Sequence, residues 1–321
     1  MSFIKNPIAP FDSPDPFITY DKETGYYYSL FTRHDRLELF RSKRLCDIVN
    51  GGDSKVIYTP TGDLHGIYGE IWAPEMHKGT DGFWYIYTSG RMTEKPGQKR
   101  LFIMKAKTAD PFGDWEFVCK PDPEVFSIDP TMYTHTDGVQ YMCCSRVRMG
   151  FGQVLDIIRM ESPSKLSDER DEVAVAELDW ELVPPYVGEN TIVEGGFFVK
   201  NGERLFLIYS ANGCWSDDYV LGVLEHTGGK LCDRSNWKKH PRPLLVKGNG
   251  LYGPGHASFF YSPDGTELWC AYHGMKEHNE KATPAERFMN VQRVFFDDEG
   301  YPVMGEAIGY DAEMAAPSGE E

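Results

Sequence analysis

The hydrophobic pattern of this chain repeats five times along its length. In each repeat a short apolar or alternating run reaches a turn with glycine and is followed by a second apolar run; the repeats are residues 17–31, 76–89, 132–145, 197–209 and 258–272. Aromatic and β-branched residues fill these runs, as is typical of strands. Two such runs joined by a turn such as Asp-Gly or Asn-Gly predict a β-hairpin.

The turn glycines recur at a nearly constant spacing. Gly25, Gly82, Gly138, Gly202 and Gly265 follow one another at intervals of 56 to 64 residues. A repeat of this length is too long for a stack of helix pairs and suits one four-stranded antiparallel sheet, the blade of a propeller. Since no helical period is sustained along the chain, little helix is expected.

The pattern therefore predicts an all-β fold, a five-bladed β-propeller in a single domain with four-stranded antiparallel blades. The expected blades cover residues 15–60, 70–120, 126–183, 192–246 and 256–308. The proline-rich residues 1–14 are expected to close the ring, and the charged segment 161–177 to be an exposed excursion. The small and acidic residues 312–321 are expected to form a flexible tail.

One ionisable residue stands at a similar place in every repeat. These residues are Asp15, Glu75, Asp129, Glu194 and His256, each seven to ten residues ahead of its turn glycine. The first strand of a blade lines the central channel, so a residue at the start of that strand faces the common axis. We therefore expect all five around one mouth of the channel. An ordinary loop residue is the alternative at any single position, and the shared phase argues against it.

The charge of the chain narrows the class of partner. Acidic residues number 49 and basic residues 33, which gives a formal net charge of −16 at pH 7. Such a protein is unsuited to nucleic acid, anionic membranes and acidic polysaccharides. A neutral substrate is therefore expected, with no nucleic-acid or membrane partner. The aromatic share of 14% suits stacking on sugar rings and packing between blades equally well.

Three features bear on the location of the protein. No apolar run reaches the roughly 18 residues that a membrane span needs. The start, MSFIKNPIAPF, lacks the apolar core of a signal peptide. The seven cysteines are an odd number and form no Cys-x-x-Cys motif. Reduced, mostly buried thiols in a cytoplasmic protein are the expectation.

Three of the in-phase residues, Asp15, Asp129 and Glu194, are of the type that hydrolysis of a glycosidic bond requires. One carboxyl group protonates the departing oxygen, and a second activates water or attacks the sugar. A third carboxylate near the acid raises the pKa of that acid and keeps it protonated at neutral pH.

The motifs around these carboxylates resemble those of glycoside hydrolase family 43. They are Asp15-Pro16, Trp72-Ala-Pro-Glu75, Ile128-Asp129-Pro130, Glu194-Gly195, Gly253-Pro-Gly-His256 and Tyr272-His273. Two longer stretches, YSANGCWSDDYVLG at 209–222 and LYGPGHASFFYSPDG at 251–265, are similar to the branch of exo-acting, arabinan-degrading α-L-arabinofuranosidases. The sequence departs from the family pattern at Gly196, where proline is common, and at Ala257, where related enzymes often have asparagine.

The resemblance implies a role for each member of the trio. Asp15 corresponds to the general base that polarises a water molecule, and Glu194 corresponds to the general acid. Asp129 corresponds to the residue that raises the pKa of the acid and orients it. The family inverts the anomeric configuration, which implies a base–acid separation of about 6.5–9.5 Å with room for water.

Further residues are expected at the pocket. Trp72 is expected to form an apolar wall against the sugar, with packing between blades as the alternative. Trp215 is expected to line the rim or a leaving-group subsite, Ser145 to bind a sugar hydroxyl, and Glu75 to support the pocket. Arg293 matches an arginine that many family members direct at the pocket, where it would contact sugar hydroxyls and the third carboxylate; an exposed strand arginine is the alternative.

His256 corresponds to a channel histidine that in many family members reaches a bound cation or an ordered water. No cofactor is required by the mechanism. If an ion binds, the expectation is a structural Ca or Na ion in the central channel, reached by His256 through waters. One histidine without further ligands is weak evidence for a metal, and a histidine with a purely structural role is the alternative.

The sequence therefore predicts an inverting, exo-acting α-L-arabinofuranosidase that releases L-arabinose from arabinan-derived oligosaccharides. A β-xylosidase or an endo-arabinanase of the same family is the alternative within this class, because the shape of the pocket cannot be read from sequence. A non-catalytic propeller that binds glycan or protein is the alternative from another class. The oligomeric state is not defined by the sequence.

Overall fold

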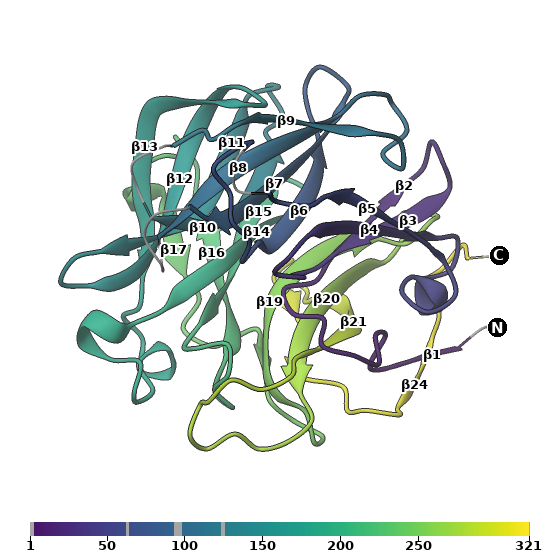
Figure 1. Cartoon of the computed structure of the whole chain (residues 1–321). Coiled ribbons are helices and arrows are strands. Elements are labelled where there is room, and N and C mark those ends of the chain that lie inside the picture. The colour runs from purple at the N-terminus through teal and green to yellow at the C-terminus, as the bar shows by residue number, and fades with distance from the viewer. Residues whose placement is uncertain (1–2, 62–63, 93–97, 123–125, 321) are drawn as a thin grey trace.

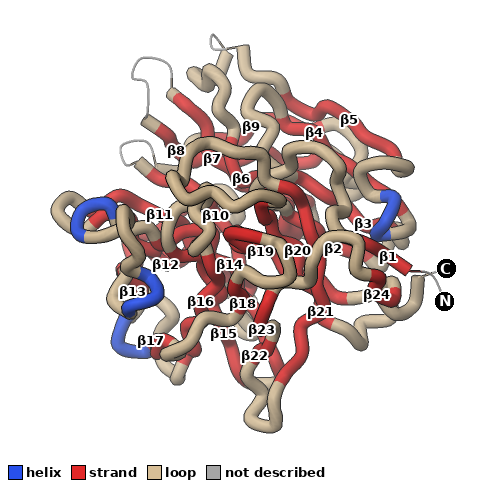
Figure 2. Tube along the Cα trace, turned by 90° about the horizontal axis from the view of Figure 1, so that it is seen from below, coloured by secondary structure: helices blue, strands red, loops and turns tan. Residues whose placement is uncertain are grey.

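The computed structural model is an all-β structure in which five sheets surround a common axis (Figure 1). This five-bladed propeller confirms the predicted fold class. The structure describes residues 3–61, 64–92, 98–122 and 126–320. Within these ranges helix is confined to four short 3-10 turns (Figure 2): η1 (Leu45–Asp47), η2 (Asp179–Glu181), η3 (Gly188–Asn190) and η4 (Arg234–Asn236). None of these turns is long and apolar enough to cross a bilayer.

Each of the first three blades is a meander of four consecutive strands. Blade one contains β2 (Phe17–Asp21), β3 (Tyr26–Leu30), β4 (Leu37–Ser42) and β5 (Asp53–Tyr58). Blade two contains β6 (Trp72–Lys78), β7 (Trp84–Arg91), β8 (Lys99–Ala106) and β9 (Trp115–Cys119). Blade three contains β10 (Ser127–Thr134), β11 (Gln140–Arg148), β12 (Gly152–Ser162) and β13 (Lys165–Val175).

The last two blades are linked by a strand that follows blade five and adds to the sheet of blade four. Blade four contains β14 (Val193–Asn201), β15 (Arg204–Ala211), β16 (Val220–His226), β17 (Trp237–Lys239) and β18 (Leu245–Val246). Blade five contains β19 (Tyr252–Tyr261), β20 (Leu268–Met275), β21 (Phe288–Phe296) and β22 (Pro302–Val303). After blade five the chain returns as β23 (Gly305–Glu306), which pairs parallel to β18. Blade four is therefore wider than the four strands that the sequence predicts.

The predicted hairpin turns are built on glycines with positive φ angles. The five turn glycines have φ between 57° and 84° and connect the first and second strands of their blades. This left-handed region is open to glycine and strained for residues with a Cβ atom. The spacing of these glycines along the sequence is therefore the spacing of blades around the ring.

Hydrophobic side chains pack between neighbouring blades, with one cluster at each of the five junctions. Representative pairs, in the order of the junctions around the ring, are Phe17 with Met76, Tyr87 with Met132, Leu155 with Leu207, Phe206 with Tyr272, and Trp269 with Tyr27. Each blade is thus buried on both faces, and the axis of the ring remains available to polar side chains.

The two ends of the chain lie side by side and close the ring (Figure 1). β1 (Phe3–Lys5) pairs antiparallel with β24 (Glu313–Ala315). Ile4 and Ile8 are buried in the cluster between blades five and one. The Asn6 side chain and the backbone of Val291 in β21 exchange two hydrogen bonds, of 2.9 and 3.0 Å. Residues 3–14 thus lie where the sequence predicts them, whereas residues 1–2 fall outside the described ranges.

Residues 312–321 are expected to form a flexible tail, and their described part makes specific contacts with the propeller. Beyond β24, the backbone N–H of Leu45 donates a hydrogen bond of 3.0 Å to Glu320. The hydroxyl of Ser318 donates to the Asp264 carboxylate. The acidic character that suggested a solvated tail instead provides acceptors that dock this segment on blades one and five.

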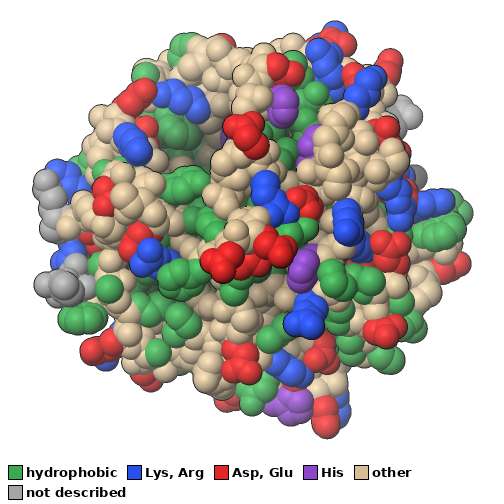
Figure 3. Space-filling view, turned by 180° about the vertical axis from the view of Figure 1, so that it is seen from behind, with side chains coloured by type: hydrophobic (Ala, Val, Ile, Leu, Met, Phe, Trp, Pro, Cys, Tyr) green, Lys and Arg blue, Asp and Glu red, His purple; other side chains and the backbone are tan. Residues whose placement is uncertain are grey.

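The charged segment 161–177 also differs from its expectation. Most of it belongs to β12 and β13, the long outer strands of blade three. β13 is the outermost strand of its sheet and exposes many side chains. Its sequence is therefore polar and lacks the apolar pattern from which a strand is predicted. Arg148, for example, pairs with Glu172 at 2.6 Å. Charged side chains of both signs are interspersed over the molecular face in Figure 3.

The first strands of four blades carry a β-bulge near the channel mouth. Register shifts lie between Trp72 and Glu75, Ile128 and Thr131, Glu194 and Phe197, and Gly255 and Ser258. Bulges re-aim side chains and are frequent next to active sites. Asp15, Asp129 and His256 have positive φ angles of 55°, 55° and 48°, a conformation that costs a non-glycine residue on the order of 1–3 kcal/mol. Three of the residues with strained backbone therefore lie at the mouth of the channel.

A buried ion pair holds the connection between blades three and four. The Glu181 carboxylate in η2 is fully buried, lies 2.6 Å from Lys239 Nζ and accepts a hydrogen bond from the Tyr209 hydroxyl. We expect Glu181→Ala to lower the free energy of unfolding by about 3–5 kcal/mol, because the buried Lys239 ammonium loses its close carboxylate partner and keeps the more distant Glu177, at 3.8 Å. Urea denaturation measures the change. Glu203→Ala, at an exposed hairpin turn, is the matched control, and an equal midpoint for the two variants would contradict the prediction.

Candidate active site

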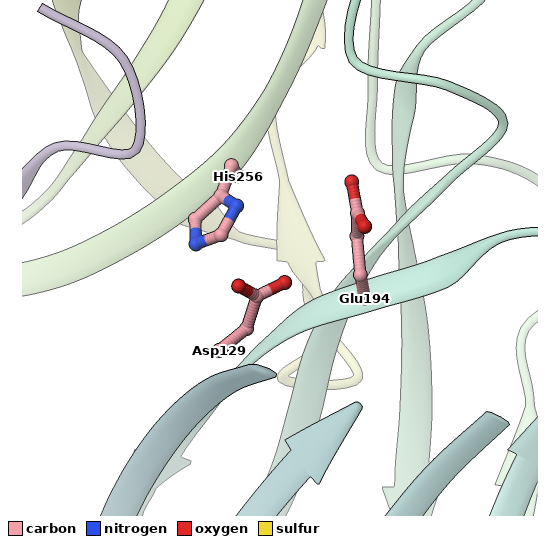
Figure 4. A group of neighbouring side chains, drawn as sticks. All are labelled: Asp129, Glu194 and His256. Atoms are coloured by element: carbon pink, nitrogen blue, oxygen red, sulfur yellow. The ribbon is translucent and has the colours of Figure 1, made fainter. Parts of the chain in front are cut away.

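The mouth of the channel holds a cavity of about 330 Å³ that is lined by four of the five in-phase residues, Asp15, Asp129, Glu194 and His256. Figure 4 shows Asp129, Glu194 and His256 turned toward one another from β10, β14 and β19. Side-chain oxygen and nitrogen atoms of these three residues lie within 4.8 Å of one another. Trp72 and Trp215 contribute apolar walls to the same cavity.

Asp15, just before β2, is surrounded by groups that favour its charged form. The Thr32 hydroxyl donates to Asp15 Oδ2 at 2.6 Å, and Arg287 Nη1 lies 3.3 Å from Oδ1. Burial alone would raise the pKa of Asp15, but Arg287, His256 and His273 together hold this pKa well below its usual range. Asp15 is therefore ionised at neutral pH.

Glu194, in β14, has the opposite environment. Its carboxyl group is buried and accepts a hydrogen bond of 2.9 Å from the Tyr219 hydroxyl. Burial and the neighbouring charge of Asp129 raise the pKa of Glu194 to about 8, although His256 and Tyr219 oppose the shift. Glu194 therefore carries a proton at neutral pH.

Asp129 lies in β10 beside Glu194. Burial raises the pKa of Asp129 to about 6, against the opposing effects of the His256 imidazole and the Gly195 backbone N–H. The two carboxyl groups interact, so the loss of one proton disfavours the loss of the other. Asp129 ionises first, and its charge then holds the proton on Glu194.

The donor set of the cavity is a poor fit for a directly bound calcium or sodium ion. Such hard cations prefer several oxygen ligands, whereas the group Asp129, Glu194 and His256 supplies two carboxyl groups and one imidazole. Burial lowers the pKa of His256, but Asp15, Asp129 and Glu194 raise it above its ordinary value. A raised pKa favours the protonated imidazole, and that form does not bind a cation. His256 lies 3.4 Å from Asp15, so its direct contact is with that carboxylate, and no step below depends on an ion.

The two tryptophans of the cavity contact polar and basic neighbours. Trp72 Nε1 donates to His34 Nδ1 at 3.2 Å, and the Lys99 ammonium lies 3.6 Å from the centroid of the Trp72 ring. The Arg287 guanidinium lies 5.6 Å from the centroid of the Trp215 ring. Both rings form apolar walls of the cavity against which the C–H face of a sugar can pack.

Comparison with known proteins decides the class of the site. The sequence matches the family described as "Glycosyl hydrolases family 43" over residues 4–302. The chain belongs to glycosyl hydrolase family 43. It is therefore a glycosidase with a carbohydrate substrate, and the alternative of a non-catalytic propeller is wrong.

Two curated relatives of this family 43 glycosidase come from Streptomyces. The extracellular exo-alpha-(1->5)-L-arabinofuranosidase of Streptomyces chartreusis is 32% identical over 83% of this chain and 82% of its own length. The protein of the same name from Streptomyces avermitilis is 29% identical over 94% of this chain and 63% of its own length. Both are named as extracellular, so the expectation of a cytoplasmic enzyme is wrong. The free cysteines and the N-terminal residues on which it rested do not determine the compartment.

Solved structures share the fold of this family 43 glycosidase. An alpha-L-arabinofuranosidase from Lactobacillus brevis superimposes with a TM-score of 0.86 at 24% identity, covering 96% of this chain and 98% of that chain. An endo-1,4-beta-xylanase from Bacteroides thetaiotaomicron superimposes with a TM-score of 0.71 at 22% identity, covering 91% and 94% of the two chains. At these identities the likeness establishes the fold alone.

Three residues that the sequence assigned to the pocket or to its support do not line the cavity. Arg293 is exposed and pairs with Glu267 at 2.8 Å, because only the start of β21 reaches the channel mouth. Ser145 is fully buried, and its hydroxyl lies 3.0 Å from the Val193 carbonyl oxygen. Glu75 is buried and lies 2.7 Å from the imidazole of a neighbour on its own strand, His77. Ser145 and Glu75 are buried in strands around the cavity, whereas Arg293 is exposed and lies away from it.

Two residues that contact Asp15 in the family 43 site, Arg287 and Thr32, were missed by the sequence reasoning, and His273 was noted without a role. Arg287, which precedes β21, takes the place expected for an arginine six residues further along. Thr32 bridges two blades, since its hydroxyl donates to Asp15 and accepts from the backbone N–H of Ala73 at 2.8 Å. His273 was noted in the Tyr-His motif, and the Asp15 backbone N–H donates to its Nδ1 at 3.1 Å. No local pattern marks Arg287 or Thr32.

Proposed function

We propose that this family 43 glycosidase is an inverting, exo-acting α-L-arabinofuranosidase that releases L-arabinose from neutral, arabinan-derived oligosaccharides. The observation that carries the reaction is the opposite ionisation of two carboxyl groups in one cavity, Asp15 charged and Glu194 protonated. The sugar is inferred from the two relatives named as arabinofuranosidases. The cavity of about 330 Å³ lies at the low end of ligand pockets, which favours one terminal sugar over a long internal segment.

The proposed reaction is a single displacement at the anomeric carbon. A water molecule beside Asp15 attacks this carbon and transfers a proton to the Asp15 carboxylate, while the bond to the leaving oxygen breaks. Glu194 donates its proton to that oxygen. The products are arabinose of inverted anomeric configuration and an oligosaccharide shortened by one sugar. Arg287 keeps Asp15 ionised beforehand, and Asp129 keeps Glu194 protonated.

A panel of substrates tests the proposal. The wild-type enzyme is given an aryl α-L-arabinofuranoside, an aryl β-D-xyloside and α-1,5-linked arabino-oligosaccharides, and the first anomer released is identified by NMR. We expect faster turnover of the arabinosides, with the β anomer of arabinose formed first. Preference for the xyloside would make the enzyme a β-xylosidase, and internal cleavage would make it an endo-arabinanase. Formation of the α anomer first would contradict inversion.

The pH profile follows from the proposed roles. We expect kcat/KM to fall as the pH rises through about 8, because Glu194 then loses the proton that it must donate. Asp129→Asn should move this alkaline limb to lower pH, since removing the Asp129 charge removes the repulsion that keeps Glu194 protonated. A pH–rate profile of each protein measures the shift. Asp298→Asn, at an exposed turn, is the matched control, and an unmoved limb in Asp129→Asn would contradict the role of Asp129.

A further inference from the structure

A second hollow adjoins the catalytic cavity and takes no part in the chemistry above. It has a volume of about 380 Å³ and lies between the β11–β12 hairpin of blade three and the connection that leads into blade four. Gln153, Tyr186 and Ile192 line both this hollow and the catalytic cavity. Glu189 and Asn190 line only the second hollow. The two spaces are therefore neighbours that share one wall.

The second hollow is built from segments in direct contact. The Gln153 backbone N–H donates to the Thr191 carbonyl oxygen at 2.8 Å. A Cβ atom on Gly152 would lie 2.4 Å from Thr191 oxygen atoms, so the hairpin approaches the connection as closely as a glycine allows. Tyr186 packs in the same way, since a Cβ atom on Gly213 would lie 2.1 Å from its ring. The shape of the hollow is thus part of the folded scaffold.

The position of the second hollow matches the side on which a leaving group departs. Glu194 follows the shared residue Ile192 by two positions on the same segment. Asp15 is held from blade five, through Arg287 and His273. In an inverting displacement the water lies on the side of the base and the departing oxygen on the side of the acid. A leaving group that departs beside Glu194 therefore continues toward the shared wall and the hollow beyond it.

The walls of the second hollow offer the mixture of groups that a neutral sugar needs. Gln153 Oε1 lies 3.1 Å from the Ser145 hydroxyl, which leaves the amide nitrogen of Gln153 as a donor. Within the described ranges, no hydrogen bond or ion pair involves the Tyr186 hydroxyl or the exposed side chains of Glu189 and Asn190. The Tyr186 ring adds an apolar surface. Sugar-binding sites combine such apolar faces with a few polar groups that fix orientation.

We propose that the second hollow binds the leaving-group part of a neutral oligosaccharide, with Gln153 and Tyr186 at the junction and Glu189 and Asn190 on the first sugar beyond the cleaved bond. This inference rests on the proposed function and names the part of the substrate that lies outside the catalytic cavity. It makes the enzyme prefer a chain of sugars over an aryl group, because an aryl leaving group lacks the hydroxyl groups that Glu189 and Asn190 bind in the proposed site.

The test compares leaving groups of different length in a double variant, Glu189→Ala with Asn190→Ala. For each protein, kcat/KM is measured on an aryl α-L-arabinofuranoside and on arabinotriose, and the ratio of the two values is compared. Losing two hydrogen-bonded groups should lower the arabinotriose-to-aryl ratio by about 5- to 50-fold. Both residues are exposed, and thermal unfolding verifies the fold. Glu203→Ala is the matched surface control and should keep the wild-type ratio.

The outcomes separate this inference from the proposed function. A double variant whose ratio equals that of Glu203→Ala, while the wild type hydrolyses arabinotriose, overturns the second hollow as a binding site alone. A wild-type enzyme that leaves both arabinosides intact overturns the proposed function, and this inference with it. If the double variant has a higher KM for arabinotriose and nearly unchanged kinetics on the aryl substrate, the ratio falls, and this result supports a leaving-group site.

Discussion

Glu194→Gln should lower kcat on arabino-oligosaccharides by about 10²–10⁴-fold, the usual contribution of a general acid. The substitution keeps the shape of the side chain and removes the proton that the departing oxygen must receive. The loss should be much smaller for an aryl arabinofuranoside with a strongly acidic phenol, because that leaving group departs without protonation. Steady-state kinetics on a series of aryl substrates of different phenol pKa measure the difference.

This leaving-group dependence separates a missing acid from a damaged fold. Glu203→Gln is the matched control, because it makes the same chemical change on an exposed hairpin turn and should leave the whole series at the wild-type rate. Thermal unfolding of both variants shows whether the propeller is intact. An equal loss of rate for every leaving group in Glu194→Gln would contradict the assignment of Glu194 as the acid.

Asp15→Asn should lower kcat by a similar factor of about 10²–10⁴, with equal loss for good and poor leaving groups. The attacking water no longer has a base, and a better leaving group does not supply one. A second effect is expected on stability, because Asp15 is the partner of the buried Arg287 side chain at 3.3 Å. Leaving a buried charge without its partner typically costs about 3–5 kcal/mol. Kinetics and urea denaturation measure the two effects separately.

The stability effect requires its own control. Asp298→Asn, on an exposed turn, should leave both kinetics and unfolding at wild-type values. Kinetics of Asp15→Asn are therefore measured at a temperature where circular dichroism shows the folded protein. A folded Asp15→Asn enzyme with wild-type turnover would contradict the role of the base, and an unchanged unfolding midpoint would contradict the electrostatic role of the pair with Arg287.

The architecture was predictable because it depends on local signals that repeat. Gly25 and Gly265 mark the first and last hairpins, and each has the positive φ angle that its turn requires. The phase of the ionisable residues relative to these glycines placed Asp15, Asp129 and Glu194 at one mouth of the ring. Where the local signal was weak, the sequence misled: the outer strand β13 reads as a polar loop because its side chains face solvent.

The same phase did not determine which side chains meet in the cavity. Glu75 keeps the phase, yet it pairs with His77 and does not line the cavity. Arg287 directly precedes β21, and Arg293 lies within it. Only the start of this strand reaches the channel mouth, so Arg287 lines the cavity and Arg293 does not. Arg287 and Asp15 are separated by 272 residues, so no local pattern links them.

From the sequence alone follow the all-β propeller, its five repeats and the three carboxyl groups in phase, because turn chemistry and strand periodicity act over a few residues. The ionisation of these groups was decided by the tertiary structure. Against the effect of burial, Arg287, His256 and His273 hold the pKa of Asp15 well below its usual range, whereas burial and the charge of Asp129 raise the pKa of Glu194 to about 8. Such effects depend on distances of a few ångströms between distant parts of the chain, and only ring closure brings those parts together.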